Sequence, residues 1–478
     1  MNTVAADGAR AAVLPLTYGQ DHEVCWALGR DQPSNAIQIA VRVDGPLDVD
    51  QFEHALRHVV RHNDGLRMRP LADTPDGASA LGQSAAPADD PSGAPLLARQ
   101  MVKARDEEQF TDYVGRTRTS AKRRAWDLVQ GPPYAFRVLR LASDHHAFLA
   151  DFSRFAIDGR GRTLFISRLW EAYVALAQGR EPGAETAPDA FAQAARRQRA
   201  AMDARSGTVN AAYWRKRYAA LFEGQQAMAG SPDANGREAQ TSACLPRQVR
   251  IAGQERIDLR SAHDGVGATV FQWVLAACAV EAFERWPDLV LEVVCQMDTR
   301  ASDAMGVLGR FTLKLPLLLK RSDDFGAVLG AIKTDVLQTM RHRHVTRADL
   351  ARARDEAAAS VRPGLADAGP STGRRIAVRL MDHGDHSEEA GLLAVGLRQS
   401  DAYPTSVGFL CEGIDLAVHV NPSRIVINLF LDPREFDDRD ADEFAAALDA
   451  RLRDEARGAA AARATAADSP WRSSGDRA

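Results

Sequence analysis

The sequence predicts an α/β (α+β) protein made of two halves, because strand-type and helix-type patterns alternate in both parts of the chain. Residues 37 to 43 carry Ile or Val at every second position, and a helix-type apolar period follows them. Residues 425 to 431 show the same alternation before the acidic, helix-type stretch from 437 to 453. A period of two is typical of a half-buried strand, and a period near 3.6 is typical of an amphipathic helix.

In the first half, each strand is followed by a helix with a recognisable start. Asp48 can cap the first helix, Gln51 completes a capping-box-like pattern, and Gly65 can end the helix. Two further strands are expected at 134 to 141 and 147 to 153. The next helix is expected to begin after Asp158 and Gly159 and to stop at Gly179.

The second half repeats this scheme. A strongly apolar helix is expected from 269 to 283, followed by strands at 289 to 296 and 315 to 319. Stretches rich in Ala, Gly, Pro, Ser and Asp read as breaks, at roughly 71 to 96, 227 to 247, 352 to 374 and after 455. We therefore predict a first lobe at 13 to 190, a second lobe with its linker at 191 to 455, and a disordered tail at 456 to 478.

Bulk composition limits the classes of partner. The chain has 478 residues and a net charge of −4, so no global basic field points to nucleic acid or to a membrane surface. The five cysteines are odd in number and mostly flanked by apolar residues, which favours reduced thiols. The sequence shows no export signal and no apolar run of about 18 residues, so we expect a cytoplasmic protein.

Eight segments in order resemble condensation domains of nonribosomal peptide synthetases, over roughly residues 13 to 453. They are LPLTYGQ at 14 to 20, GPLDVDQFEHALRHVVRHNDGLRMR at 45 to 69 (which resembles the family's first helix with its RH-x-x-LR signature), AWDLVQGPPYAFRVLRL at 125 to 141, DGRGRTLFISRLWEAYVAL at 158 to 176, AAYWRKRY at 211 to 218, ATVFQWVLAACAVEAFERW at 268 to 286, GRFTLKLPL at 309 to 317, and INLFLDPREFDD at 427 to 438.

The resemblance implies a particular architecture and chemistry. Two lobes similar to chloramphenicol acetyltransferase would form a V with a tunnel between them. Phosphopantetheine arms of donor and acceptor carrier proteins would enter from opposite faces, and an acceptor amine or alcohol would attack the donor thioester. No bound cofactor is implied. A free-standing unit would meet acyl or peptidyl carrier proteins in trans.

The active-site loop departs from the family's His-His-x-x-x-Asp-Gly pattern. Aligned on Asp158 and Gly159, Ser153 stands for the first histidine and Arg154 for the second, which in the family serves as the base or orienting group. Arginine offers only hydrogen-bond donors and stays charged, so it cannot accept a proton at neutral pH. Arg154 could instead hold an oxyanion or a substrate carboxylate, or it could be a structural plug paired with Asp158 or another acid.

The candidate catalytic residues are therefore Arg154, Ser153 and Asp158, with Gly159 structural. In the family, the loop aspartate pairs with an arginine, and the RH-x-x-LR match supplies Arg61 and Arg67 as candidates. We expect Arg67 to be that partner. Leu313 stands where the family has an asparagine on the second-lobe strand and is followed by Lys314, so substrate contacts do not carry over.

Other histidines are weaker candidates. His145-His146 lies upstream of the loop, and its register does not fit the family spacing, so we expect it on the incoming strand. His342 with His344, and His383 with His386, have spacings that a metal could use, but no Cys or Glu completes a pattern. We expect no metal site.

Three functions remain open on the sequence. The first is a condensation-like protein that engages carrier-bound thioesters as a gate, scaffold or recruitment module and has lost ordinary histidine-dependent amide formation. The second is an acyltransferase that forms an amide or ester without the histidine, using Arg154, Ser153 and the basicity of the substrate amine. The third is an acyl-CoA transferase of the same superfamily, with one tunnel mouth sealed. The fold is common to all three and does not separate them.

Overall fold

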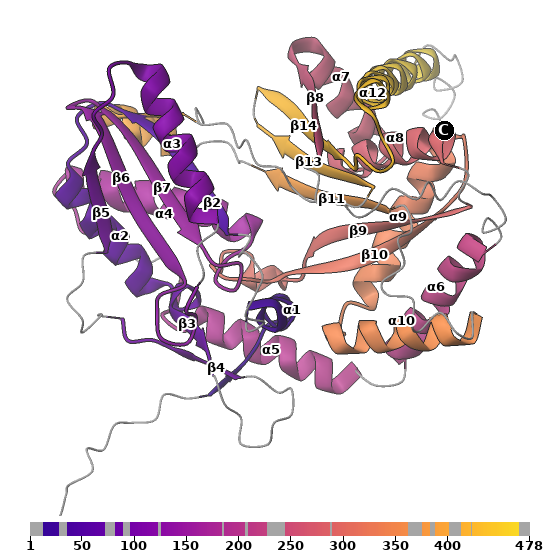
Figure 1. The fold of residues 1–478 in the computed structure, drawn as a ribbon, viewed down its shortest axis with the longest axis horizontal. Helices are drawn as coiled ribbons and strands as arrows, with labels where there is room; N and C mark the ends of the chain where they lie inside the picture. The colour runs from indigo at the N-terminus through magenta and orange to yellow at the C-terminus, as the bar shows by residue number, and fades with distance from the viewer. Residues whose placement is uncertain are drawn as a thin grey trace, which may run out of the picture.

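The computed structural model describes residues 13–27, 36–71, 82–88, 96–122, 126–183, 186–205, 209–226, 244–286, 289–361, 375–382, 388–400, 413–421 and 423–467. The described chain folds into two α/β lobes that diverge from a shared base, which gives the V shape seen in Figure 1. The predicted fold class is confirmed. Among the described residues, no single helix is long and apolar enough to cross a membrane.

The first lobe is a five-stranded sheet with helices on both faces. Its strand order is β12-β2-β7-β6-β5, antiparallel except for the parallel pair β5 and β6. The strands are β2 (Ile37–Asp44), β5 (Leu97–Met101), β6 (Tyr134–Ala142), β7 (His145–Phe152) and β12 (Arg398–Ser400). The helices are α2 (Val49–His62), α3 (Glu107–Lys122), α4 (Gly159–Ala177) and α11 (Glu388–Ala394).

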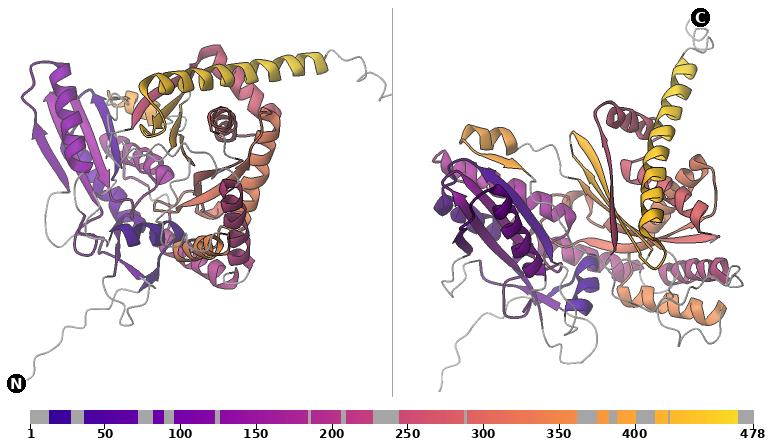
Figure 2. Two further views of the ribbon diagram at one scale, coloured as in Figure 1. Left: turned by 45° about the vertical axis from the view of Figure 1, so that its right-hand side comes forward. Right: turned by 45° about the horizontal axis from the view of Figure 1, so that its top comes forward.

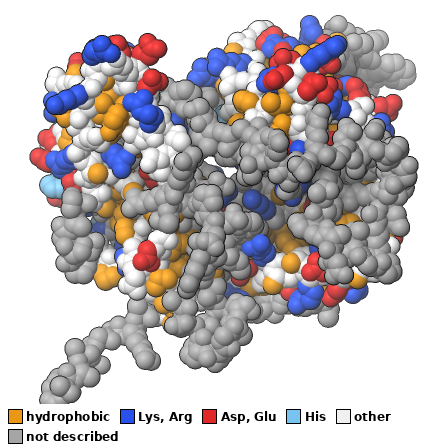
Figure 3. All heavy atoms as spheres, in the orientation of Figure 1, with side chains coloured by type: hydrophobic (Ala, Val, Ile, Leu, Met, Phe, Trp, Pro, Cys, Tyr) orange, Lys and Arg blue, Asp and Glu red, His pale blue; other side chains and the backbone are white. Residues whose placement is uncertain are grey.

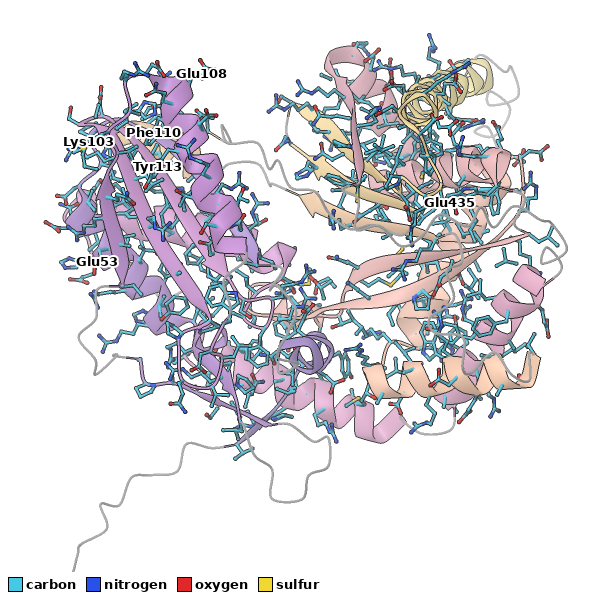
Figure 4. All side chains as sticks on the ribbon, in the orientation of Figure 1. Glu53, Lys103, Glu108, Phe110, Tyr113 and Glu435 are labelled. Carbon is cyan, nitrogen blue, oxygen red and sulfur yellow. The ribbon has the colours of Figure 1, made fainter. Side chains whose placement is uncertain are left out.

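Aromatic and branched side chains fill the two layers of this lobe. Phe52 of α2 contacts Phe148 of β7 and Trp170 of α4, so these helices cover one face of the sheet. Phe110, labelled in Figure 4, is fully buried and packs α3 on the opposite face with Leu149. Burying side chains of this size contributes about 1.5–3 kcal/mol each.

The second lobe is a six-stranded sheet with the order β10-β9-β11-β13-β14-β8. The strands are β8 (Leu245–Ala252), β9 (Val290–Asp298), β10 (Thr312–Lys320), β11 (Arg375–Asp382), β13 (Ile414–Val420) and β14 (Arg424–Leu431). The helices are α6 (Val209–Gln226), α7 (Gly253–Gly265), α8 (Val270–Arg285), α9 (Phe325–Arg341), α10 (Arg347–Val361) and α12 (Asp438–Ala467).

Alternation along β10 separates a core face from a polar face. Leu313, Leu315, Leu317 and Leu319 are buried in the large core cluster with α8 and α9. Lys314 points to the other face because successive residues of a strand alternate. Thr269 caps α8 through a complete capping box with Gln272, so the buried helix starts at a fixed residue.

The base of the V joins the lobes through short elements. It contains β1 (Leu14–Pro15), β3 (Met68–Pro70) and β4 (Gly82–Ala85), which form a small sheet, with α1 (Tyr18–Ala27), α5 (Ala190–Arg205), η1 (Asp64–Arg67) and η2 (Ser302–Ala304). Asp64 accepts hydrogen bonds from the backbone N–H groups of Phe191 and Ala192, at 3.0 and 2.9 Å, and so fixes the start of α5. Figure 2 shows both lobes resting on this base.

Three sequence predictions on organisation need correction. Residues 388 to 400 belong to the predicted second lobe, yet β12 pairs with β2, and α11 contacts α4, so this segment completes the first lobe. The predicted break at 352 to 374 is wrong for 352 to 361, which form α10. The predicted disordered tail is wrong for 456 to 467, because α12 continues to Ala467 and buries Ala456.

Candidate functional site

The loop between β7 and α4 lies at the junction of the lobes, and Ser153 begins it. The Ser153 hydroxyl accepts a hydrogen bond from the N–H of Phe155 at 3.2 Å, and the Ser153 carbonyl accepts one from Ala156 at 3.0 Å. The residue is 5% exposed. Ser153 therefore shapes the turn, and its buried hydroxyl is poorly placed for attack on a substrate.

Asp158 ends this loop and caps α4. Its side chain accepts a hydrogen bond from the N–H of Gly161 at 2.8 Å. The backbone N–H groups of Phe311 and Thr312, from the second lobe, donate to the same carboxylate at 2.8 and 3.1 Å. One buried side chain thus joins a helix start of the first lobe to the start of β10.

The arginine partner of Asp158 is Arg300, which follows β9. Its two terminal nitrogens donate to the two carboxylate oxygens at 2.8 and 3.0 Å, and both side chains are fully buried. Burial alone would raise the pKa of Asp158, but the Arg300 charge and the hydrogen bonds outweigh it and hold that pKa below its usual value.

The predicted pairing of Asp158 with Arg67 is therefore wrong. Arg67 donates instead to the carbonyl of Ala86 at 2.6 Å, and Arg61 is exposed on α2. Both residues lie in the segment that resembles the family's first helix, on α2 and η1, and Asp158 pairs with Arg300 instead. The predicted role of the aspartate, to shape the site through an arginine, agrees with the observed geometry.

The two glycines after Asp158 differ in what they require. A Cβ on Gly159 would meet nothing within 4 Å, so packing does not demand glycine there. A Cβ on Gly161 would lie 2.7 Å from Ile157 and 3.1 Å from the carbonyl oxygen of Gly309. The close approach of the lobes therefore depends on Gly161, which the sequence analysis did not assign.

Arg154 forms an ion pair with Glu23 of α1, not with Asp158. Its Nε lies 3.3 Å from Glu23 Oε1, and Arg310 donates to the same oxygen at 2.8 Å. The side chains of Arg154, Glu23 and Arg310 are 24%, 12% and 2% exposed. The acid that pairs with Arg154 is thus Glu23 and not Asp158.

Lys314 of β10 completes the basic side of the junction. Burial lowers the pKa of Lys314 to about 8, with further lowering from Arg154 and the opposite influence of Glu23. Across the sheet, burial raises the pKa of Asp415 on β13, although Arg379 lies 3.2 Å away. Figure 3 shows Lys and Arg side chains in the hollow between the lobes.

Four residues of the site were not predicted from the sequence: Glu23, Arg300, Arg310 and Asp415. Arg310 lies inside the quoted GRFTLKLPL segment, and its position two residues before a strand was the available signal. Arg300 lies two positions after the end of β9, but it is 142 positions from Asp158. Nothing in the local pattern around Glu23 marks it as an arginine partner.

The histidines have structural partners. His145 and His146 lie at the start of β7, as expected, and His145 contacts Glu107 at 3.0 Å. His342 bonds to Asn210 at 2.8 Å, and buried His344 bonds to the Tyr18 hydroxyl at 2.7 Å. His383 and His386 fall outside the described residues. Among the residues that the structure describes, no group of three or more His, Cys, Asp or Glu could hold a metal ion.

Comparison with known proteins identifies the fold and the family. The family model described as "Condensation domain" matches residues 23–366, well over half of the chain. The chain belongs to the condensation-domain family. The resemblance drawn from the eight sequence segments is confirmed.

Curated relatives of this condensation-domain protein are long synthetases. A linear gramicidin synthase of Brevibacillus parabrevis is 24% identical over 337 residues, which cover 69% of this chain and 6% of that protein. The isonitrile lipopeptide synthase of Streptomyces coeruleorubidus is 25% identical over 321 residues, covering 64% of this chain and 19% of that protein. The chain therefore matches only a small part of each.

Solved condensation-type structures match nearly the whole condensation-domain chain. The X-domain from teicoplanin biosynthesis has a TM-score of 0.66 at 21% identity and covers 95% of this chain and 96% of that chain. The first condensation domain of the calcium-dependent antibiotic synthetase has a TM-score of 0.67 at 18% identity, covering 93% and 96%. At these identities the likeness establishes the fold alone.

Proposed function

We propose that this condensation domain engages carrier-bound thioesters at its lobe junction but does not catalyse histidine-dependent amide formation. The observation that carries the proposal is Arg154, which takes the place of the family's second histidine and is ion-paired with Glu23. The loop contains no histidine between Ser153 and Gly159.

Amide formation requires the acceptor amine to lose a proton, which a general base in the site would accept. A positioned general base contributes about 100- to 10,000-fold to a reaction rate. Arg154 has no lone pair to accept a proton, and Glu23 already accepts from Arg310 and faces Arg154. The Ser153 hydroxyl is buried in its turn. The loop thus offers no group suited to the family's base chemistry.

The geometry of the lobe junction supports a binding role. Asp158, Arg300 and the backbone of Phe311 hold the two lobes together at the place where the carrier arms meet in the family. Phosphopantetheine arms of acyl or peptidyl carrier proteins, supplied in trans, are the proposed ligands. A solved complex joins the teicoplanin X-domain to OxyB, and that example supports a recruitment or gating role for this fold.

The test separates binding from turnover. The full chain is mixed with a carrier protein loaded with an acyl thioester and with candidate amine acceptors. Binding is followed by fluorescence anisotropy of a labelled carrier, and turnover by intact-protein mass spectrometry. We expect saturable binding without amide product. Amide formation by the wild-type chain would show that it is an acyltransferase with a different site, and absent binding would remove the carrier-handling role.

A further inference from the structure

The cationic side chains at the lobe junction exceed the acids available to them. Arg154 and Arg310 share one carboxylate oxygen of Glu23. Lys314 interacts electrostatically with all three of these residues, yet it makes no hydrogen bond or ion pair with any residue that the structure describes. Two arginines thus share Glu23, and the Lys314 ammonium has no direct partner among the described residues.

The neighbouring strands add to this imbalance. Arg375 and Arg379 of β11 both interact electrostatically with Asp415, and Arg379 forms its ion pair at 3.2 Å. Arg375 also acts on Lys314. Asp415 is the acid on this side, and burial raises its pKa. Asp158 also acts on Arg310, but it is already paired with Arg300. In the described part of the junction, the five cations Arg154, Arg310, Lys314, Arg375 and Arg379 thus have Glu23 and Asp415 as their other acids.

Such an arrangement selects the charge of its ligand. A half-buried cation is costly unless a counterion pairs with it, because the surrounding protein solvates it less well than water. A ligand ammonium would be repelled, whereas a carboxylate would form charge-assisted hydrogen bonds with Lys314 and Arg154. The unmatched charge therefore favours an anionic ligand group.

We propose that the lobe junction binds an acyl group that carries a free carboxylate, and that Lys314 and Arg154 hold this carboxylate. The inference rests on the proposed function, because it names the class of carrier-bound acyl group that the same site accepts. The ligand class is a dicarboxylic acid joined to its carrier through one of its two carboxyl groups, with the second left free.

The titration of Lys314 supports this assignment. Its pKa of about 8 is set by burial, by Arg154, Arg310 and Arg375, and in the opposite direction by Glu23. A bound carboxylate favours the ammonium form and raises this pKa, so binding takes up a proton. Affinity for the carboxylate is therefore greatest below pH 8 and falls as the pH rises through that value.

The experiment uses two stable mimics of a carrier-bound acyl group, in which an amide replaces the thioester. The N-(2-acetamidoethyl) amides of succinic and butyric acid are titrated into the full chain by calorimetry at pH 7 and pH 9. At pH 7 we expect the succinyl compound to bind at least tenfold more tightly than the butyryl compound. Between pH 7 and pH 9 this preference should fall about tenfold, as the ammonium fraction of a group with a pKa near 8 does.

Three variants separate the charge of Lys314 from its bulk. Lys314→Met should abolish the preference, and Lys314→Arg should keep it while removing most of its pH dependence. Lys320→Met is the matched control, because Lys320 is exposed at the far end of the same strand, and it should behave as the wild type. Circular dichroism verifies that each variant is folded.

The outcomes distinguish this inference from the proposed function. Equal affinities for the two compounds, or a preference that survives Lys314→Met, would overturn the carboxylate site. The calorimetric titration needs neither a carrier protein nor turnover. If the wild type prefers the succinyl compound but also forms amide in the loaded-carrier experiment, only the proposed loss of catalysis is contradicted.

Discussion

The carboxylate of Asp158 in the first lobe accepts two hydrogen bonds from the guanidinium of Arg300 in the second lobe, at 2.8 and 3.0 Å. Both side chains are fully buried. The aspartate of the loop between β7 and α4 therefore joins the two lobes, and this role does not depend on a histidine in the loop.

Removing Arg300 should lower the free energy of unfolding far more than removing Arg67, the partner of Asp158 that the sequence predicted. Arg300→Met leaves a buried carboxylate without its charge partner, which typically costs about 3–5 kcal/mol in the free energy of unfolding. Arg67→Met removes a hydrogen bond to a carbonyl and should cost about 1 kcal/mol. Guanidinium denaturation of both variants measures the difference. Equal losses would contradict the assigned pairing.

The same pair predicts a dependence of stability on pH. The pKa of Asp158 is lowered in the folded chain, so its contribution is fully present above the unfolded value of about 3.9 and is lost as the pH falls through the folded value. The difference in unfolding free energy between wild type and Asp158→Asn should therefore be constant from pH 5 to 7 and shrink below pH 4. Urea titrations at several pH values measure this difference in unfolding free energy. A difference that grows below pH 4 would contradict the lowered pKa of Asp158.

Gly309 is required by the close approach of the lobes. It has φ +155°, and a Cβ there would lie 2.3 Å from the ring of Phe191. Its carbonyl also accepts a hydrogen bond from Arg300 at 3.0 Å. Gly309→Ala should lower stability by about 1–3 kcal/mol through strain and displacement of that ring. Gly159→Ala is the matched control, since nothing lies within 4 Å of its Cβ, and a thermal melt compares the two.

Local patterns predicted the elements that position the site. The alternation at 37 to 43 became β2, Asp48 caps α2 through the N–H groups of Asp50 and Gln51, and Asp158 caps α4. These features depend on neighbouring residues, so the sequence contains them directly. The resemblance placed Ser153 and Arg154 in the loop between β7 and α4, which is where they lie.

The remaining features depend on contacts that are distant in sequence. Asp158 and Arg300 are 142 residues apart, and β12 joins a sheet whose other strands lie more than 240 positions earlier, so composition and period reveal neither. The Ala-rich stretches within α10 and at the end of α12 read as breaks, although alanine is the strongest helix former. Their helices are fixed by packing, as buried Ala357 and Ala456 show.

The most direct test of the central claim compares Arg154 with its substitutes in the loaded-carrier assay. Intact-protein mass spectrometry follows the acyl carrier thioester with wild type, Arg154→Ala and Arg154→His. We expect no amide product from wild type or Arg154→Ala. Only Arg154→His, which restores a proton acceptor at this position, should gain turnover, by about 100-fold or more over background. Turnover by wild type that is lost in Arg154→Ala would instead make Arg154 part of an altered catalytic site and refute the proposed loss of catalysis.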